Sequence, residues 1–455
     1  MKIMIPQSTR RLSSTFLRHK KHHDVLIVGG GAVGSACAKL LEERCGASLS
    51  IGLVDQSPSL PPLSSAPIPH PRSYALSPKS LELLNLEAIV PSKLGTYKTM
   101  QVWEQNSPGM LVFTASDLPE SQDHLGACVE DSVLVNALYN SLQSTSIYRG
   151  EAVQDLQQSS CSVSLRTPSH DFTASLLIAA DGGNSWIRQN RGIPWLGWDY
   201  GKTAITFTVE LAHNMPARAF QRFLPHGPMA LLPTFSEKHA VVVWSTTPEL
   251  AAHYKEASSE DLAALVNDTL SVGPQRPVPL FESSRTSLLN NVLYGMERLV
   301  DTVHFGLAMR HWSDFETGFM APPKVASVVS PRMTFPLMCR HVDTYTQNRV
   351  VLVGDAAHVM HPMAGQGLNL GLQDVNELTM AIQKAFSSGM DVSTFMYEYG
   401  RSRKRDVSLR LAGIHMLHEV FASSGPFVHA KSLGMQVANQ VGPIRRQLAA
   451  VAAGL

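Results

Sequence analysis

The strongest constraint on the fold lies near the amino terminus, where a glycine cluster separates an apolar run from a helical pattern. Residues 24–28 form the apolar run, helical spacing follows over 35–42, and a second apolar run over 49–54 ends in Asp55. The three glycines of the intervening G-x-G-x-x-G are Gly29, Gly31 and Gly34. Strand, glycine turn, helix and strand in this order predict a βαβ unit.

Each glycine of this fingerprint has a separate physical task. The first permits a tight turn, the second lets the backbone approach a pyrophosphate, and the third lets the helix pack on the strand. The helix N-terminus supplies N–H groups and partial positive charge for the diphosphate. Asp55, 21 residues beyond Gly34, is placed to accept the hydroxyl protons of an adenosine ribose. The pattern predicts a dinucleotide site but does not distinguish FAD from NAD.

Two later elements favour FAD, because they provide a second clamp that NAD enzymes do not need. Asp181 follows the apolar run 176–180 and precedes Gly182, so its carboxylate is expected at a strand end facing the same cleft. Asp355 follows Gly354 at the end of the strand expected over 350–353, within reach of a ribityl or pyrophosphate group. Main-chain N–H groups in the next segment are expected to approach the carbonyls of a planar ring; they belong to Gly365, Gly367, Leu368 and Asn369.

Composition excludes several other classes of function. A chain of 455 residues divides into more than one domain, and its net charge of +1 gives no reason to expect nucleic acid. The five cysteines have no C-x-x-C spacing, so neither a zinc knuckle nor a redox pair is predicted, and no metal site is expected. No run approaches the roughly 18 apolar residues of a membrane span, so any membrane contact is expected to be peripheral.

The first 23 residues have the composition of a mitochondrial presequence. They are rich in Lys, Arg, Ser and Thr, and no acidic residue occurs before Asp24. A disordered basic tail is the alternative interpretation. Six prolines then break regular structure in the loop 56–72, from which Arg72 emerges as a further cofactor-binding candidate.

The remaining pattern predicts an α/β architecture: a Rossmann-like FAD-binding domain, split in sequence, with an inserted antiparallel-sheet substrate domain and C-terminal helices. β-rich runs over 99–116 and 203–246 indicate the inserted sheet, and helical patterning returns from about 366. The expected pieces are a presequence (1–23), FAD-binding segments (24–98, 126–198 and 336–390), substrate-domain segments (99–125 and 199–335) and C-terminal helices (391–455).

The three motifs stand in the order used by the flavoprotein aromatic hydroxylases of the para-hydroxybenzoate hydroxylase type, which the chain resembles from Asp24 onward. D-G-x-N-S-x-x-R spans 181–188, and G-D-A-A-H-x-x-H-P-x-A-G-Q-G-x-N spans 354–369. Within that family the likeness is to the ubiquinone biosynthesis monooxygenases of mitochondria. Further segments support it: 222–233, 243–246 and 434–443.

The resemblance implies that reduced FAD takes O₂ to a C4a-hydroperoxide and transfers the distal oxygen to C5 of a 4-hydroxy-3-polyprenylbenzoate. No catalytic side chain is then expected, because the flavin carries the chemistry. The ring-side candidates are His361, Pro362 and Met363. The resemblance also implies a ferredoxin and its reductase as electron donor, membership of a ubiquinone-biosynthesis complex, and peripheral contact with the matrix side of the mitochondrial inner membrane.

Several residues keep two interpretations. His358 and His361 can serve the cofactor loop or ligate a metal, and Met360, Met363, Met338 and Phe335 can line a pocket or fill a core. Trp195 and Trp198 suggest a flavin halogenase, but the W-x-W-x-I-P segment is missing. The basic residues Arg401, Arg403, Lys404 and Arg405 form a solvated helix face or contact an acidic partner or anionic lipid, and Leu433–Leu455 packs on the protein or lies on a membrane.

Two other functions compete with hydroxylation. A flavin reductase or dehydrogenase acting on an isoprenoid has the same fold, and a non-catalytic subunit of a biosynthetic assembly keeps the fold without turnover. Intact Gly29, Asp181 and Asp355 argue against the non-catalytic subunit.

Overall fold

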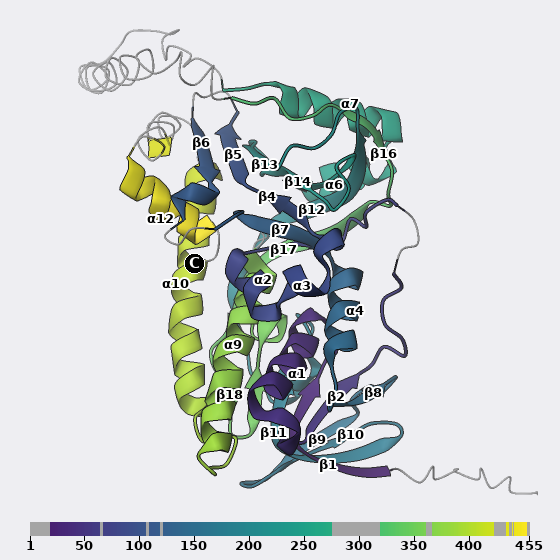
Figure 1. Cartoon of the computed structure of the whole chain (residues 1–455), viewed down its shortest axis with the longest axis vertical. Helices are drawn as coiled ribbons and strands as arrows, with labels where there is room; N and C mark the ends of the chain where they lie inside the picture. The colour runs from purple at the N-terminus through teal and green to yellow at the C-terminus, as the bar shows by residue number, and fades with distance from the viewer. Residues whose placement is uncertain are drawn as a thin grey trace, which may run out of the picture.

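Two large β-sheets lie toward opposite ends of the molecule, and long helices run alongside the first of them (Figure 1). The computed structural model describes residues 19–63, 67–105, 109–118, 122–274, 319–360, 366–422, 434–435, 439 and 441–452. The predicted fold class is confirmed, because a mainly parallel sheet flanked by helices is combined with a largely antiparallel sheet.

The first sheet is built around a parallel core. Its strands are β1 (His19–Val28), β2 (Ile51–Asp55), β8 (Ser146–Arg149), β9 (Asp155–Gln158), β10 (Val163–Arg166), β11 (His170–Ala179), β18 (Thr346–Gln347) and β19 (Val350–Leu352). The order is β18-β19-β11-β1-β2-β8, and the pairs β19–β11, β11–β1, β1–β2 and β2–β8 are parallel. The carboxyl ends of β19, β11, β1 and β2 therefore meet at one edge.

Strand β1 begins at His19, five residues before the predicted start of the folded chain at Asp24. Residues 19–23 pair with 170–174 of β11, so the last part of the predicted presequence belongs to the sheet. The side chains from His19 to His22 are exposed, and only backbone pairing holds them. A search for apolar runs cannot find this segment, because it is polar and forms a strand only by pairing with β11.

Helices cover the first sheet and the second domain. They are α1 (Ala32–Cys45), α2 (Pro78–Leu84), α3 (Leu86–Ile89), α4 (Asp131–Ser141), α5 (Trp186–Asn190), α6 (Pro248–Glu256), α7 (Ser259–Ser271), α9 (Gln366–Ser387), α10 (Met396–Ala422) and α12 (Gly442–Ala452). Short 3₁₀ turns are η1 (Gly46–Ser48), η2 (Pro91–Lys93), η3 (Ala115–Asp117) and η4 (Gly354–Ala356).

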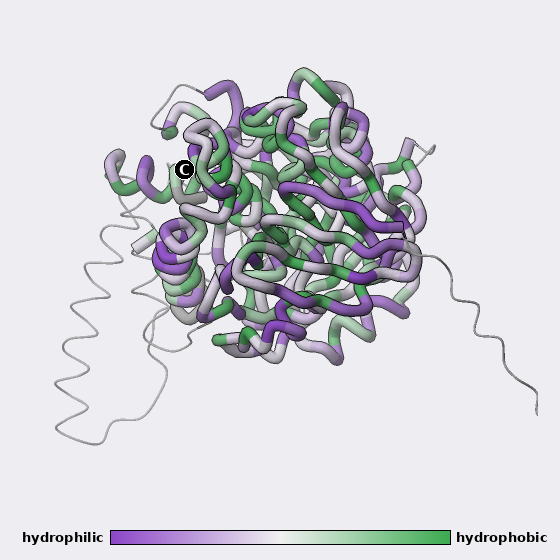
Figure 2. The backbone as a smooth tube through the Cα atoms, turned by 90° about the horizontal axis from the view of Figure 1, so that it is seen from below, coloured by the Kyte–Doolittle hydropathy of each residue, from purple (hydrophilic) through white to green (hydrophobic). Residues whose placement is uncertain are grey.

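Helix α1 is rich in Ala, Leu, Lys and Glu, which are strong helix formers, and it ends at Gly46 with φ +69°. Its C-terminal turn is tied to α9, since Arg44 donates to the Asn376 carbonyl at 2.7 Å and to the Asn376 side chain at 2.6 Å. Helices α9 and α10 lie side by side along one flank (Figure 1). Figure 2, seen from the end where β9 and β10 lie, shows hydrophilic stretches along the strands that face the viewer.

The second sheet is largely antiparallel. Its strands are β5 (Thr99–Glu104), β6 (Met110–Thr114), β12 (Trp195–Leu211), β13 (Arg218–Phe223), β14 (Met229–Pro233), β15 (His239–Thr246), β16 (Val325–Val328), β17 (Met333–Val342) and β20 (His358–Val359). A separate three-stranded sheet joins β3 (Ser73–Leu76), β7 (Gly126–Glu130) and β4 (Gly95–Tyr97). Helices α6 and α7 lie at the end of the molecule occupied by the second sheet (Figure 1).

Two strands cross the predicted domain boundaries. β12 begins at Trp195, before the boundary at 198/199, and β17 continues to Val342, beyond the boundary at 335/336. The two strands pair along most of their length, from Trp195↔Val342 to Thr206↔Met333. This pairing, which contains a register shift between Asp199 and Lys202, therefore extends the second sheet beyond both predicted boundaries.

The proline-rich loop fastens the second sheet over the first domain. Thr208 Oγ1 donates to the Pro69 carbonyl at 2.7 Å, and Thr206 Oγ1 donates to the Pro71 carbonyl at 3.2 Å. Both threonines are buried, and they point to the face of β12 opposite Phe207. These bonds fix the backbone of the loop directly before Arg72.

The structure also bears on membrane spans and on the cysteines. None of the helices in the described ranges is both long enough and apolar enough to cross a membrane. All five cysteines are free thiols.

Burial in the first domain generates a stability prediction. Leu41 of α1 is fully buried in the cluster that α1, α4 and α9 share, so Leu41→Ala should lower the free energy of unfolding by about 2–5 kcal/mol. Leu409→Ala on α10 is the matched control, because that side chain is 68% exposed and should change stability little. Thermal unfolding of both variants, followed by circular dichroism, checks this; equal midpoints would contradict the assigned core.

Candidate cofactor site

The three sequence motifs meet at one edge of the first sheet. They follow β1, β11 and β19, which are neighbours in the order β19-β11-β1 and run parallel. In an open parallel sheet, ligands bind beyond the carboxyl ends of the strands. The edge that carries Gly29, Asp181 and Asp355 is therefore the candidate site.

The backbones at this edge approach each other more closely than a side chain would allow. A Cβ at Gly29 (φ +104°) would lie 2.3 Å from the Ala180 carbonyl oxygen, and one at Gly34 would lie 1.8 Å from the Gly29 carbonyl oxygen. A Cβ at Gly371 of α9 would lie 3.1 Å from the Gly354 Cα. These contacts join the first motif to the second, and the third motif to the following helix.

The amino end of α1 is free to receive an anion. Gly31 occupies its N-cap, the first turn contains no acidic residue, and no side chain of the described residues caps it. A Cβ built at Gly31 would meet no atom of the described residues within 4 Å. Uncapped N–H groups beside open space are what a pyrophosphate requires, so the cradle fits the diphosphate of a dinucleotide.

Asp55 makes contacts that the sequence did not indicate. Its Oδ2 accepts from the Gly30 N–H at 2.5 Å and its Oδ1 accepts from the Ser57 N–H at 2.7 Å. The carboxylate thus holds the glycine turn in place. A carboxylate has about four lone-pair sites, so it can still accept a ribose hydroxyl.

Two residues near this turn were not found from sequence. The Tyr139 hydroxyl would lie 2.0 Å from a Cβ at Gly30, and it is buried without a hydrogen-bond partner among the described residues. The Arg149 guanidinium lies over the Tyr139 ring, 4.4 Å from its centroid. Burial raises the pKa of Tyr139 to about 12. A neutral hydroxyl and a cation therefore border the predicted ribose position, and no motif marks them.

The second motif forms a compact loop. Gly182 has φ +81°, Asp181 Oδ2 accepts from the Ile187 N–H at 3.1 Å, and Ser185 caps α5. Asp181 Oδ1 is buried without a partner in the part of the chain that is described, and burial raises the pKa of this carboxyl. Such an oxygen lacks the partner that a buried polar atom normally has, so it suits a hydroxyl donor from a ligand.

Arg188 supports this loop from beneath. It is 4% exposed, donates from Nη1 to the Gly183 carbonyl at 3.0 Å, and stacks over the Trp195 ring at 4.0 Å. The last residue of the motif therefore stabilises the loop that the motif forms.

Asp355 lies in η4, directly after β19 at the motif edge. Its side chain is exposed, yet burial among surrounding protein raises its pKa, against the opposing effects of His358 and Arg72. An exposed carboxylate that is also closely surrounded by protein is suited to contact a ligand. Arg72 faces it from the proline-rich loop: burial lowers the pKa of Arg72, but Tyr74, Asp131 and Asp355 together raise it. Arg72 also pairs with Asp131 at 3.3 Å.

The last predicted segment is only partly described. Gly367, Leu368 and Asn369 lie in the first turn of α9, while His361, Pro362, Met363 and Gly365 lie outside the described residues. The Asn369 side chain is occupied, because its Oδ1 accepts from the Ser77 N–H at 2.9 Å and from Ser80 Oγ at 2.7 Å. Its role within the protein is to dock the start of α9 against α2.

A buried ionic network beneath the third motif was missed from sequence. Asp374 of α9, with no exposed side-chain area, accepts from Arg403 Nε at 2.8 Å and contacts His358 Nε2 at 2.6 Å. Its Oδ2 also accepts from the Gly354 N–H at 2.9 Å. Although burial acts to raise it, His358 and Arg403 hold the pKa of Asp374 below its usual range. This carboxylate joins η4, α9 and α10.

The network bears on two interpretations made from the sequence: Arg403 on a solvated helix face, and His358 as a metal ligand. A solvated helix face is one of the two interpretations given above for Arg403, but the residue is 1% exposed and pairs with Asp374 and Glu377. That interpretation is wrong for Arg403, because the sequence shows that the helix is charged but does not show which helix packs against it. His358 contacts a single carboxylate, and the described residues contain no group of three side chains suited to a metal.

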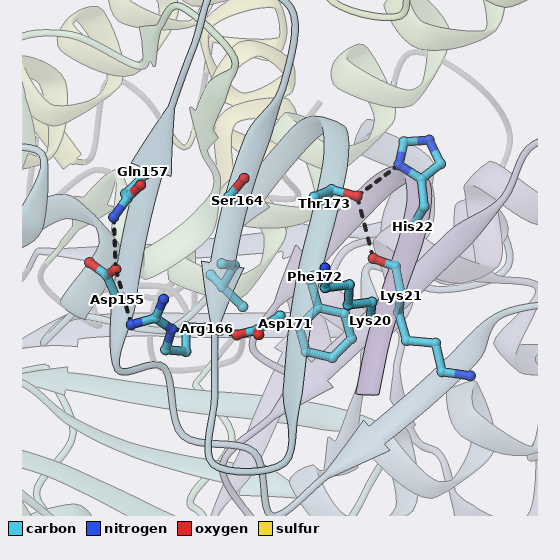
Figure 3. Close-up of a pocket in the computed structure, with 11 residues that line it drawn as sticks. Lys20, Lys21, His22, Asp155, Gln157, Ser164, Arg166, Asp171, Phe172 and Thr173 are labelled. Atoms are coloured by element: carbon cyan, nitrogen blue, oxygen red, sulfur yellow. Dashed lines mark hydrogen bonds and ion pairs between the residues drawn. The ribbon is translucent and has the colours of Figure 1, made fainter. Parts of the chain in front are cut away.

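A separate hollow of about 340 Å³ lies at the amino end of β1 and contains none of the predicted site residues (Figure 3). Three of its charged groups pair with one another: Arg166 lies 3.4 Å from Asp171 and 4.0 Å from Asp155. Lys21 in its wall is eight residues from Gly29, roughly 25 Å along a strand. This hollow is therefore remote from the motif edge.

Comparison with known proteins places the chain in a family. A family model described as FAD binding domain matches residues 22–293 and 320–408. The ubiquinone biosynthesis monooxygenase COQ6, mitochondrial, of Danio rerio is 30% identical over 94% of this chain and 89% of that protein. The corresponding protein of Xenopus tropicalis is 30% identical over 99% and 97%. The chain belongs to the FAD-dependent ubiquinone biosynthesis monooxygenases.

Membership of this family confirms the resemblance inferred from the three motifs, and with it FAD as cofactor and monooxygenase as enzyme class. Among solved structures, the p-nitrophenol 4-monooxygenase PnpA of Pseudomonas putida DLL-E4 aligns with a TM-score of 0.67 and 16% identity. The alignment covers 95% of this chain and 97% of PnpA. At that identity the likeness shows a shared fold.

The buried network generates a prediction. Asp374→Asn should lower the free energy of unfolding by about 3 kcal/mol, because it leaves His358 and Arg403 without their shared anion. FAD should also dissociate faster, since η4 loses its anchor. Glu377→Gln is the control: that side chain is 37% exposed, so solvent screening limits its effect to about 1 kcal/mol. Equal FAD retention and stability in the two variants would contradict an anchoring role.

The same carboxylate predicts a pH dependence. Because its pKa is lowered in the folded protein, its stabilisation is complete above the ordinary Asp pKa of about 3.9 and is lost as pH falls through the folded value. The stability of the wild-type protein should therefore fall more steeply below about pH 4 than that of Asp374→Asn. Urea unfolding between pH 3 and pH 7 measures this, and parallel curves would show that Asp374 does not titrate as described.

Proposed function

We propose that this protein binds FAD across the motif edge and uses it to hydroxylate the aromatic ring of a polyprenylated 4-hydroxybenzoate with O₂. The observation that carries the proposal is the meeting of three separate cofactor motifs at one edge of the first sheet. It is supported by relatives, named for ubiquinone biosynthesis, that match along nearly the whole chain.

Different residues at this edge would bind different parts of the cofactor. The start of α1 and Gly31 would hold the pyrophosphate, and Asp55 would accept a ribose hydroxyl. Asp181 and Asp355 would bind the middle of the molecule, and the first turn of α9 would face the ring. The bound flavin supplies the redox chemistry with oxygen, which no side chain can supply.

The chain's own contribution is to cover the reacting ring and exclude water. The second sheet lies over the cleft, fastened by the threonine bonds to the proline-rich loop. Of the pocket candidates, Met360 is buried in a core cluster, whereas Phe335 on β17 is 38% exposed. We therefore assign Phe335 to the substrate side and Met360 to the core, whereas Met338, three residues further along β17, points to the opposite face of that strand.

Finer features of the activity are also part of the proposal. We infer hydroxylation at ring C5, electron delivery by a ferredoxin and its reductase, and membership of a ubiquinone-biosynthesis complex. Relatives are named as mitochondrial. We place this protein in mitochondria, in peripheral contact with the matrix side of the inner membrane, where a polyprenylated substrate is held.

One prediction tests the placement of FAD. Asp355→Ala removes a hydrogen-bonding carboxylate from the cleft and should weaken FAD binding by about 1–3 kcal/mol, or roughly 5-fold to 150-fold. Asp343→Ala is the control, since that carboxylate lies on the surface and pairs with Lys404. Flavin fluorescence during dialysis measures retention in both variants, and unchanged retention in Asp355→Ala would show that Asp355 is misplaced.

A second prediction tests the reaction and its electron donor. With ferredoxin, its reductase and a prenylated 4-hydroxybenzoate, the purified protein should consume O₂ and release a ring-hydroxylated product in step. Oxidation of an isoprenoid without O₂ uptake would favour a dehydrogenase instead. Rapid bleaching of the flavin by NADPH alone, without oxygen, would overturn the ferredoxin assignment.

A further inference from the structure

A hollow of about 480 Å³ lies between the second sheet and helices α6 and α7, on the side away from the cofactor edge. Arg222 and Trp244 line it from β13 and β15, and Leu265 and Thr269 line it from α7. Trp244 shares a core cluster with Phe207 of β12, whereas Thr206 and Thr208 on the other face of β12 bond to the proline-rich loop. Side chains alternate along a strand, so the hollow and the FAD cleft lie on opposite faces.

Arg222 is a buried cation without a counter-ion. It is 3% exposed and forms no ion pair with any carboxylate among the described residues. Nη1 donates to the Thr269 carbonyl, while Nε is buried and has no partner in the described part of the chain. Arg403 shows the ordinary arrangement, because two carboxylates hold it. Buried charges in proteins are normally paired, so Arg222 lacks a partner that a ligand can provide.

The walls of the hollow indicate what kind of anion fits. Trp244 and Tyr254 both line the hollow and stack on each other, with ring centroids 4.6 Å apart and planes at 22°, so part of the wall is aromatic. Leu224 and Leu265 add apolar surface. Lys202 Nζ donates to the carbonyl of His226, one of the lining residues, at 2.7 Å.

One feature limits the ligand's charge. Asp268 lines the hollow and is exposed, but it makes no ion pair with Arg222. Its carboxylate repels a second negative charge. A dianion such as phosphate is therefore disfavoured, whereas a single carboxylate can take the two-pronged geometry that a guanidinium offers.

We propose that this hollow is a binding site for a small aromatic monocarboxylate, held by Arg222 and the Trp244–Tyr254 wall and separate from the cofactor cleft. The proposal does not depend on the hydroxylase reaction, because none of its residues belongs to the motif edge.

The experiment uses the FAD-loaded full-length protein and 4-fluorobenzoate as probe, with binding followed by ¹⁹F NMR line broadening. Arg222→Met should weaken binding about tenfold or more, since a charge-assisted hydrogen bond is lost. Arg218→Met is the matched control. Arg218 lies four residues before Arg222 on the same face of β13 and donates to Gln101 at 2.9 Å, so binding should be unchanged. Uncharged 4-fluorobenzyl alcohol and inorganic phosphate should bind at least tenfold more weakly than 4-fluorobenzoate to the wild-type protein.

A second variant keeps the test decisive if Arg222→Met does not fold. Asp268→Asn changes an exposed side chain, and it should tighten 4-fluorobenzoate binding by about twofold or more because a like charge is removed. Unchanged binding in both Arg222→Met and Asp268→Asn would overturn the site. Binding that shifts the flavin absorbance and ignores Arg222 would place the probe in the cofactor cleft instead. Equal binding of phosphate would overturn the monocarboxylate assignment.

Discussion

The close approach of three backbones at one edge of the first sheet is the constraint on which the cofactor site depends. Gly34 rests against the Gly29 carbonyl, Gly29 against Ala180, and Gly371 against Gly354. The contacts at Gly29 and Gly34 leave no room for a Cβ, and the one at Gly371 is tighter than an ordinary van der Waals contact. Because the turns after β1 and β11 meet backbone to backbone, and the turn after β19 packs against Val33 of α1, their N–H groups and carboxylates lie at one edge of the sheet. An extended cofactor can then be held along its whole length.

Buried charge has two different roles in this molecule. Asp374 is satisfied by Arg403, His358 and the Gly354 N–H, so its desolvation is offset and it ties the third motif to α9 and α10. Arg222 is desolvated without any carboxylate partner among the described residues. A paired charge within the protein supports a rigid scaffold, whereas an unpaired one beside a hollow favours a ligand. The comparison of these two arginines separates a structural cation from a candidate binding residue.

The functional class followed from short, local signals. G-x-G-x-x-G, the Asp181 loop and the Asp355 turn each specify a backbone shape within a few residues, and together they indicated the fold, FAD and the enzyme class that the comparisons confirm. The structure adds that these motifs share an edge. Other features had no local signal. The early start of β1 depends on residues 170–174, the burial of Arg403 depends on Asp374, and Tyr139 reaches Gly30 from another helix.

The sequence by itself determined which segments form the nucleotide-binding turns, because glycine conformations and strand ends are set by neighbours along the chain. Only the tertiary structure decided which charges are paired. In the sequence, Arg403 and Arg222 are both ordinary basic residues. They differ in whether a carboxylate lies beside them, and this depends on helices and strands that are distant in the sequence. Whether two charges pair depends on their distance in the folded protein. Asp374 and Arg403 are 29 positions apart in the sequence, and they form an ion pair only because α9 and α10 pack together.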